Sequence, residues 1–444
     1  MLRLLKPVPV RQLGACKLPK KEAFLGLFAS HLSFVLIWIV SLASILGMLL
    51  RPRGLAEAWW ACGGAVLLIV TGLMPLRLAG HAIAEGLDVY LFLTGMMVLA
   101  EIAREEHVFD WAAGVAAVHA KGSPRRLFLL VYMVGIVVTA LLSNDATAVV
   151  LTPAVLEVVR RARINPKPYL LACAFVANAA SFVFPISNPA NLVVFGPQIP
   201  SLFRWLGIFL LPSGASIVVT YLCVRWHGRS DLKGTISGEL EDAPLTAEGK
   251  LALSGLLLAA IALIASSALG LELGLPTCAA ALVALVVVST QNRRIVTSVV
   301  RGVSWSVLPL VAGLFVVVDA LHSAGLLQLG PKGLNGLAQL PAWAAKVASA
   351  LAVALASNCM NNLPVGLVGG AAIRAAHESG LMAHSILIGV DLGPNLSVTG
   401  SLATILWLIA LRREKVEISA FEFFRLGLFA MPAALLASLI LLWR

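Results

Sequence analysis

The sequence predicts an all-α, polytopic membrane protein, and three observations support this fold class. Of the 444 residues, 59% are hydrophobic and only 12% are charged, and the mean hydropathy is +0.93, which a soluble protein of this length does not reach. Apolar runs long enough to cross a bilayer recur along the chain. Basic residues cluster in the short polar stretches between these runs, which is the positive-inside pattern of multi-pass proteins.

The composition also excludes several classes of protein. The net charge of +11 does not indicate a nucleic-acid partner, because the basic residues lie between apolar segments. The six cysteines lack the spacing of a metal site or a disulfide framework, so we expect no metal and no cofactor. The sequence has no zinc-protease, Walker or nucleophile-elbow motif, which argues against an enzyme. We therefore expect a non-enzymatic protein of the plasma (inner) membrane, embedded in lipid.

Ten segments have the length and hydropathy of transmembrane spans. A basic tail, residues 1–23, precedes them, and a linker, residues 227–249, divides them into two groups of five. The positive-inside rule places this linker in the cytoplasm. The basic tail conflicts with that topology, since ten spans then place both chain ends outside the cytoplasm. The predicted spans are 23–50, 57–75, 87–103, 169–200, 203–225, 250–270, 275–290, 303–321, 384–411 and 420–443.

A polar stretch, SNDAT at Ser143–Thr147, interrupts a further apolar segment. Basic residues at 121–126 and 160–167 flank the segment and place both of its ends on one side of the membrane. One arm, residues 127–142, spans about 24 Å as a helix, which is short of the ~30 Å hydrocarbon core. We therefore expect residues 127–161 to enter the membrane, turn at the polar stretch and return as a re-entrant hairpin.

Three features recur in the same order in the second half of the chain. SNDAT has its counterpart in SNCMNN, with Ser357 lying 214 positions after Ser143, and two further stretches recur at offsets of 218 and 212. With five spans in each half, the halves have opposite orientations, which is the inverted-repeat plan of secondary transporters. We expect a first repeat over 24–226 and a second over 250–444, the latter with its own hairpin over 343–377.

Two further polar clusters interrupt segments that are otherwise long enough to cross. Pro185 lies within 169–200, and Gly393 and Pro394 lie within 384–411. Proline removes a helix hydrogen bond and glycine loosens the backbone, so we expect both transmembrane helices to be broken there. Non-helical backbone at membrane depth persists only where protein buries it or where it lines a wet cavity. We therefore expect the two hairpin tips and the two breaks to converge near the midplane and to line a substrate site.

The same stretches resemble the signature regions of the arsenical pump membrane protein (ArsB) family. They are SNDATAVVLTPAV at 143–155, NNLPVGLVGG at 361–370 and GVDLGPNLSVTGSLATILWL at 389–408, and the run GSLATILWL is the most specific of them. The resemblance extends over about residues 24–443. It implies a transporter of the ion transporter superfamily that exports arsenite and antimonite. It also implies that the proton gradient drives export or, with a soluble arsenite-stimulated ATPase subunit as partner, that ATP does.

Two positions depart from the pattern of that family. The family commonly has an aspartate where this chain has Asn178 and a lysine where it has Asn395. A charged pair is thereby replaced by a neutral amide pair, so proton coupling rests on Asp145 and Asp391. Of these two, Asp145 is favoured, because its repeat partner is the uncharged Cys359. Uniport, an ATP-driven pump, and a sodium/proton or anion transporter of the same superfamily stay open as alternatives to proton-coupled antiport.

The polar groups suit the substrate that the resemblance implies. Arsenous acid is an uncharged trihydroxide at neutral pH, and hydroxyl and amide side chains can both donate to and accept from its OH groups. A dicarboxylate needs cationic partners, and no Arg, Lys or His lies near any cluster, whereas a sodium ion suits the same oxygens. The candidate substrate-binding residues are Asn144, Asp145, Thr147, Ser187, Asn188, Asn191, Ser357, Asn358, Asn361, Asn362, Asp391, Asn395, Thr399 and Ser401.

Overall fold

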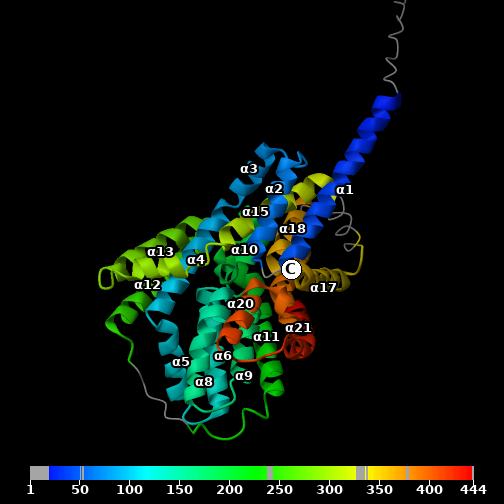
Figure 1. Ribbon diagram of the computed structural model, residues 1–444. Helices are drawn as coiled ribbons and strands as arrows, with labels where there is room; N and C mark the ends of the chain where they lie inside the picture. The colour runs from blue at the N-terminus through cyan, green and yellow to red at the C-terminus, as the bar shows by residue number, and fades with distance from the viewer. Residues whose placement is uncertain are drawn as a thin grey trace, which may run out of the picture.

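The computed structural model describes residues 20–50, 52, 55–237, 244–326, 336, 339–376 and 380–442. Within these residues every regular element is a helix, which confirms the all-α fold class (Figure 1). Most of the predicted basic tail lies outside the described residues. The first helix, α1 (Lys20–Leu50), extends away from the other helices at the upper right of Figure 1.

Six described helical segments are long and apolar enough to cross a membrane, and the bent pair α3 (Leu76–Glu85) and α4 (Leu87–Glu105) would be a seventh. The chain is therefore a multi-pass membrane protein, as predicted. The predicted count of ten spans stays a prediction, because other apolar helices are shorter and two segments are broken. The six are Pro124–Leu141 (α6), Leu202–His227 (α11), Ala247–Ala268 (α12), Ile295–Gly325 (with α14, Ile295–Gly302, and α15, Val307–Leu321), Ala342–Met360 (α17) and Ala420–Leu441 (α21).

The chain reverses at the first polar stretch. The hydroxyl of Thr147 lies 2.8 Å from that of Thr139, so the chain after Ser143 folds back beside the helix that precedes it. At the other end, the hydroxyl of Tyr169, which follows the second arm, donates to Pro124 O at 2.9 Å. The start of the first arm and the end of the second therefore lie at the same level. The elements are α6, α7 (Asn144–Ala146), the π-helical turn η2 (Thr147–Leu151), α8 (Thr152–Arg161) and the following α9 (Lys167–Ala179).

The second polar stretch reverses the chain in the same way. A Cβ on Gly389 would lie 2.3 Å from Ala350 O, and one on Gly393 would lie 2.6 Å from Ala354 O, so α19 runs parallel to α17 and close against it. The intervening α18 must therefore return, and it begins directly after Asn361, which has a φ of +73°. The elements are α17, α18 (Asn362–Ala375) and α19 (Leu381–Leu392).

Both broken segments are interrupted at their prolines. The first stops helical winding at Ala179 and resumes it at Pro189, with one 3-10 turn between. The second stops at Leu392 and resumes at Leu402, with two 3-10 turns between. The elements after the first break are η3 (Pro185–Ser187), α10 (Pro189–Phe195) and η4 (Gly196–Gln198), and those after α19 are η6 (Gly393–Asn395), η7 (Val398–Gly400) and α20 (Leu402–Arg413).

Two glycines pack each half of the chain closely on the other. A Cβ on Gly95 of α4 would lie 2.7 Å from Thr277 O, and one on Gly313 of α15 would lie 2.7 Å from the carbonyl carbon of Ala61. The two glycines are 218 positions apart, which is an offset of the predicted repeat. This exchange of contacts supports the inverted repeat, whose boundaries stay a prediction. The partner helices are α2 (Glu57–Val70) and α13 (Gly274–Ser289).

Basic loops that are distant in sequence meet at one end of the molecule. Arg160 Nη1 lies 2.8 Å from Glu414 Oε2, and Ile236 N in the linker donates to Gly122 O at 2.9 Å. The first contact joins the end of α8 to the loop after α20, and the second joins the linker to the loop after α5 (Val108–His119). These basic segments therefore lie at one end of the molecule, as the positive-inside rule predicts.

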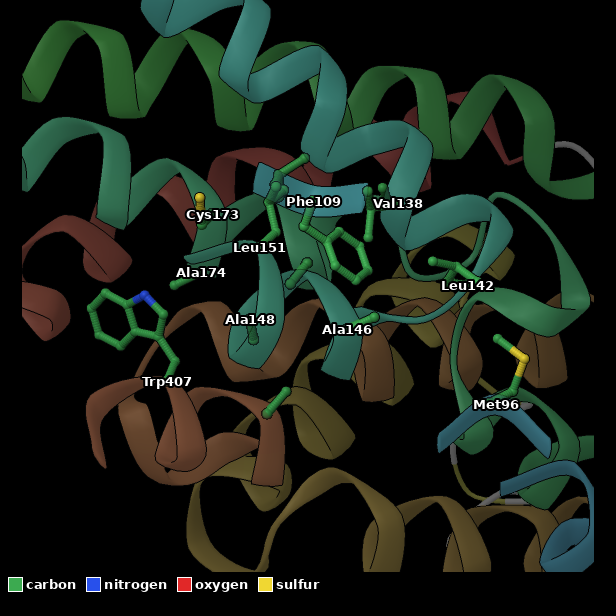
Figure 2. Packing of buried hydrophobic residues seen from close by; sticks show 14 of the residues in the cluster. Met96, Phe109, Val138, Leu142, Ala146, Ala148, Leu151, Cys173, Ala174 and Trp407 are labelled. Atoms are coloured by element: carbon green, nitrogen blue, oxygen red, sulfur yellow. The ribbon is translucent and has the colours of Figure 1, made fainter. Parts of the chain in front are cut away.

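An apolar cluster holds the tip of the first hairpin against the second half. Leu142, Ala146 and Ala148 of the tip are buried in this cluster. Trp407 of α20 is fully buried in the same cluster and lies near Ala174 of α9, on the Ala148 side of the tip (Figure 2). The first tip is thus held by contact with α20, which lies in the second half of the chain.

Candidate functional site

The two broken segments cross in opposite directions inside the protein. Asn178 Nδ2 donates to Asn395 Oδ1 at 3.0 Å, and Asn188 Nδ2 donates to Asp391 Oδ1 at 2.7 Å. Residue numbers rise along the first segment while they fall along the second, so the segments are antiparallel. None of these four residues is more than 2% exposed. Two halves of opposite orientation produce such a crossing.

Ser181 and Asn191 join the same hydrogen-bond network. Ser181 Oγ donates to Asn178 O at 2.8 Å, and Asn191 Nδ2 donates to Ser181 O at 2.9 Å. Both side chains are fully buried, and they stabilise backbone that the break leaves without helical partners. We refer to six residues together as the polar crossing: Asn178, Ser181, Asn188, Asn191, Asp391 and Asn395.

Three oxygen atoms of the polar crossing are buried without a hydrogen-bond donor among the described residues. They are Asn178 Oδ1, Asn191 Oδ1 and Asp391 Oδ2. The hydroxyl of Ser181, which donates to Asn178 O, is also within hydrogen-bond reach of the Asp391 carboxylate, so one O–H group is shared between two acceptors. An unpaired buried acceptor costs about 1–3 kcal/mol. Three such acceptors in one network can receive hydrogen bonds from a donor ligand or coordinate a cation.

The polar crossing offers a negative or neutral environment. Asp391 is its one carboxylate, and within the described part of the chain no Arg, Lys or His is hydrogen-bonded to any of its members. A ligand with several carboxylates would lose its hydration here without gaining a cationic partner. The arrangement suits a neutral donor or a small cation.

The tip of the second hairpin forms a separate polar cluster with the break in its own repeat. Asn358 Nδ2 donates to Gly393 O at 2.9 Å, and Asn358 Oδ1 accepts from Ser397 Oγ at 2.6 Å. Thr399 Oγ1 donates to Asn358 O at 3.0 Å. Since both ends of the Asn358 amide are occupied, Asn358 and Thr399 hold the break against the hairpin tip.

The tip of the first hairpin is also engaged with its own repeat. Ser187 Oγ in the break donates to Ala140 O at 3.0 Å. Asn144 Oδ1 accepts from Asp145 N at 2.9 Å, and the hydroxyl of Thr147 is paired within the hairpin. Asp145 is partly exposed as a residue, and no described side chain is hydrogen-bonded to its carboxylate.

The remaining predicted residues serve mainly their local backbone. Ser357 donates to a carbonyl one turn earlier in its helix, while Asn361 and Ser401 cap the first turns of α18 and α20. Asn362 is 3% exposed. Of the predicted site residues, the structure brings four into the polar crossing: Asn188, Asn191, Asp391 and Asn395.

Three polar residues at these elements were not among the predicted site residues: Asn178, which the family pattern had singled out as the partner of Asn395, Ser181 and Glu57. Ser181 belongs to the polar crossing, and its place three residues after Asn178, on the same helical face, is the signal that would have indicated it. Glu57 of α2 lines a small cavity together with Asn361 and Thr399. It lies outside every polar stretch of the sequence, so only the packing of α2 brings it there.

Known proteins resemble this chain over most of its length. A family described as citrate transporter (CitMHS) matches residues 32–414, which include both hairpins and both breaks. The arsenical pump membrane protein of Escherichia coli K12 is 29% identical over 397 residues, covering 85% of this chain and 91% of the relative. That of Yersinia enterocolitica is 29% identical over 394 residues, with the same coverage. An uncharacterized transporter of Mycobacterium tuberculosis is 27% identical over 385 residues, covering 80% and 85%.

A solved structure shares the fold. The crystal structure of the YdaH transporter of Alcanivorax borkumensis, which is described as having an unusual topology, superposes with a TM-score of 0.56 and covers 82% of this chain and 86% of that one. At 16% identity the likeness concerns the fold alone. The sequence resemblance to the arsenical pump membrane proteins is confirmed by the relatives above.

Proposed function

Because this chain belongs to the citrate transporter (CitMHS) family, and is thus a membrane transporter, we propose that its cargo is trivalent arsenic and antimony, exported from the cytoplasm as uncharged hydroxides. Relatives that are 26–29% identical and are named arsenical pump membrane proteins support this cargo. Their bacterial sources support a place in the inner membrane. The family description names citrate instead, so the chemistry of the site has to discriminate between the two.

The three buried oxygens without donors are the observation that carries the proposal. Arsenous acid and its antimony analogue each present three hydroxyl groups, and each hydroxyl can donate one hydrogen bond. Citrate presents acceptors and negative charge, which would face Asp391 and the amide oxygens without a cationic partner among the described residues. The acceptors of the polar crossing therefore match the hydroxides and repel the carboxylates.

We further propose that protons drive export by competing with the substrate at Asp391. When Oδ2 is unprotonated, it can accept a hydrogen bond from a substrate hydroxyl. When it is protonated, it is itself a donor, and the substrate loses that acceptor. Proton and substrate would then occupy the polar crossing in turn, which is the requirement for antiport. The sequence favours Asp145 for this role, whereas the buried acceptor at the crossing favours Asp391.

A sodium ion is the second candidate ligand, because amide and carboxylate oxygens without donors also coordinate sodium. In that case export would depend on sodium in place of protons. Replacing sodium by choline in the transport buffer separates the two couplings. Removing both ion gradients and supplying ATP distinguishes the other two mechanisms. A uniporter would then move arsenite only down its own gradient, whereas a pump with a soluble ATPase subunit would accumulate it.

Uptake of arsenite into everted membrane vesicles tests the proposal, since uptake in this orientation reports export. We expect uptake that needs an imposed proton gradient, that is inhibited by antimonite and that is unaffected by excess citrate. Asp391→Asn should abolish the gradient dependence, while Asp231→Asn, a change at an exposed position outside the polar crossing, should not. Gradient-driven uptake of citrate without uptake of arsenite would contradict the proposed cargo.

A further inference from the structure

Two glycines make room for the guanidinium group of Arg374, at the end of α18. A Cβ on Gly370 would lie 3.1 Å from Arg374 Nη1 and 2.5 Å from Val194 O, and one on Gly196 would lie 3.4 Å from the same nitrogen. Gly196 also has a φ of +53°, which L side chains adopt only at a cost. The niche is thus built from both repeats, since α10 and α18 belong to different halves of the chain.

Arg374 faces a pocket of about 550 Å³ that other cationic and polar groups share. Arg204 from the first turn of α11 and the buried His384 from the first turn of α19 line it. Gln198 and Ser201 add an amide and a hydroxyl group. No carboxylate of the described residues lines this pocket. We refer to it as the arginine pocket.

The two arginines of the arginine pocket form no ion pair within 4 Å among the described residues, unlike several other basic residues. A second pocket, at the opposite end of α11, is also basic, but Glu422 and Asp231 line it too, and Lys167 Nζ lies 3.1 Å from Glu422 Oε2. In the described ranges, no ion pair includes Arg204 or Arg374. Glu85 attracts Arg374 only from beyond ion-pair distance, so no carboxylate is directly paired with either arginine among the described residues.

Arg374 makes one hydrogen bond that stabilises the local structure. Its Nη1 donates to Val194 O at 3.4 Å, near the C-terminal end of α10, where a cation is favourable. This single long bond uses one of the five donors of the guanidinium group. Two helices also begin at the pocket, α11 and α19, and neither has a side-chain cap. Their free N–H groups add to the positive potential.

The position of the pocket points to the membrane interface. α11 is a candidate transmembrane helix, and the pocket lies at its first turn, where headgroups meet the hydrocarbon core. Phe203, next to Arg204, is 74% exposed, and Leu210 and Leu211 further along the helix are 54% and 62% exposed. An apolar surface thus continues from the pocket along α11, as an acyl chain requires.

We propose that the arginine pocket binds the phosphate of an anionic phospholipid, with Arg204 and Arg374 as its ligands and the acyl chains along the exposed face of α11. Guanidinium groups match phosphate oxygens in pairs, and basic pockets between membrane helices bind such headgroups. The site is separate from the polar crossing, so the inference does not depend on the identity of the cargo. A free phosphate ion is the other source of the same chemistry.

Thermal unfolding of the purified full-length protein in detergent tests this inference, with phosphatidylglycerol, phosphatidylcholine or inorganic phosphate added. We expect phosphatidylglycerol to stabilise the wild type more than phosphatidylcholine does. Arg204→Ala should require roughly tenfold more phosphatidylglycerol for the same stabilisation, as the loss of one charge-assisted contact predicts. Arg229→Ala, in the acid-balanced basic pocket, is the matched control and should behave like the wild type.

Arg374→Lys provides the second variant, because it keeps the charge but loses the paired donors. It should fall between the wild type and Arg204→Ala in phosphatidylglycerol dependence. Equal stabilisation of the wild type and Arg204→Ala by phosphatidylglycerol would overturn the proposed site. Stabilisation by inorganic phosphate, with no further effect of phosphatidylglycerol, would overturn the lipid as ligand.

Discussion

The amide nitrogen of Asn188 lies 2.7 Å from Asp391 Oδ1, and this bond joins the start of α10 to the last turn of α19. The two residues come from opposite halves of the chain. Their contact occupies one oxygen of the carboxylate and leaves Oδ2 buried, without a donor among the described residues. A carboxylate held in this way can accept a hydrogen bond from a substrate or bind a proton at that oxygen, but not both.

Asp391→Asn should remove the pH dependence of arsenite binding. In the wild type we expect binding to weaken as the pH falls, because protonation converts the acceptor Oδ2 into a donor. The amide does not titrate, so binding to the variant should be independent of pH and weaker than wild-type binding at neutral pH. Equilibrium binding of arsenite to purified protein measures both effects.

Asp145→Asn is the matched comparison for that experiment. Its side chain has no described partner at the hairpin tip, so we expect wild-type affinity and wild-type pH dependence of binding. If Asp145→Asn loses the pH dependence while Asp391→Asn keeps it, the coupling carboxylate belongs to the hairpin tip and the competition mechanism is wrong.

Charges introduced at the amide pair should be tolerated together and not singly. Asn178 and Asn395 are both fully buried and 3.0 Å apart. A single Asn178→Asp or Asn395→Lys leaves a buried charge without its partner, at a cost of about 3–5 kcal/mol. The double variant restores a charge pair and should retain more folded protein and more arsenite resistance than either single variant. Equal losses in all three would count against this interpretation.

The close helix contacts predict that Gly95 and Gly313 cannot be replaced by larger residues without loss of stability. Gly95→Val and Gly313→Val should each lower the thermal unfolding temperature in detergent, because the Cβ atom alone would lie 2.7 Å from the backbone of the partner helix. Gly207→Val is the control, since a Cβ there meets no heavy atom within 4 Å. A normal unfolding temperature for Gly313→Val would show that α2 and α15 do not pack as described.

The two hairpin tips are expected to approach each other near the middle of the membrane. Cys359 lies exposed at the second tip, and its repeat counterpart in the first is Asp145. With the other cysteines replaced by serine, Asp145→Cys should be joined to Cys359 by a short bifunctional thiol reagent. Trp111→Cys on α5, outside both tips, provides the control. Cross-linking of the control but not of the tip pair would contradict the predicted convergence.

Prolines and glycines made the breaks predictable, because their effect on a helix is local. Basic flanks and a short arm likewise indicated the chain reversal at Ser143, and the internal repeat extended this prediction to the reversal at Asn361. The partners of the polar residues were not predictable in the same way. Asn358 and Asn188 are both amides in broken or reversed segments. The amide nitrogen of Asn358 donates to the backbone carbonyl of Gly393, whereas that of Asn188 donates to the carboxylate of Asp391.

This difference depends on how the two halves of the chain pack together. The sequence of one half does not predict which residues of the other half it will contact. Asn178 is an exception, because the family pattern predicted that it pairs with Asn395, and the structure confirms this pair across 217 positions. Glu57 illustrates the limit, because α2 reaches the second hairpin tip through its packing on α15.

The anomalous scattering of arsenic in crystals grown with arsenite tests the central claim most directly. The proposed function predicts one strong peak within the polar crossing, placed so that the hydroxyl groups bonded to the arsenic reach Asn178, Asn191 and Asp391, and the loss of this peak in Asp391→Asn crystals. A peak at the thiol of Cys359 with none in the polar crossing would contradict the claim. The absence of any arsenic peak at the polar crossing, in a protein that still exports arsenite, would contradict it as well.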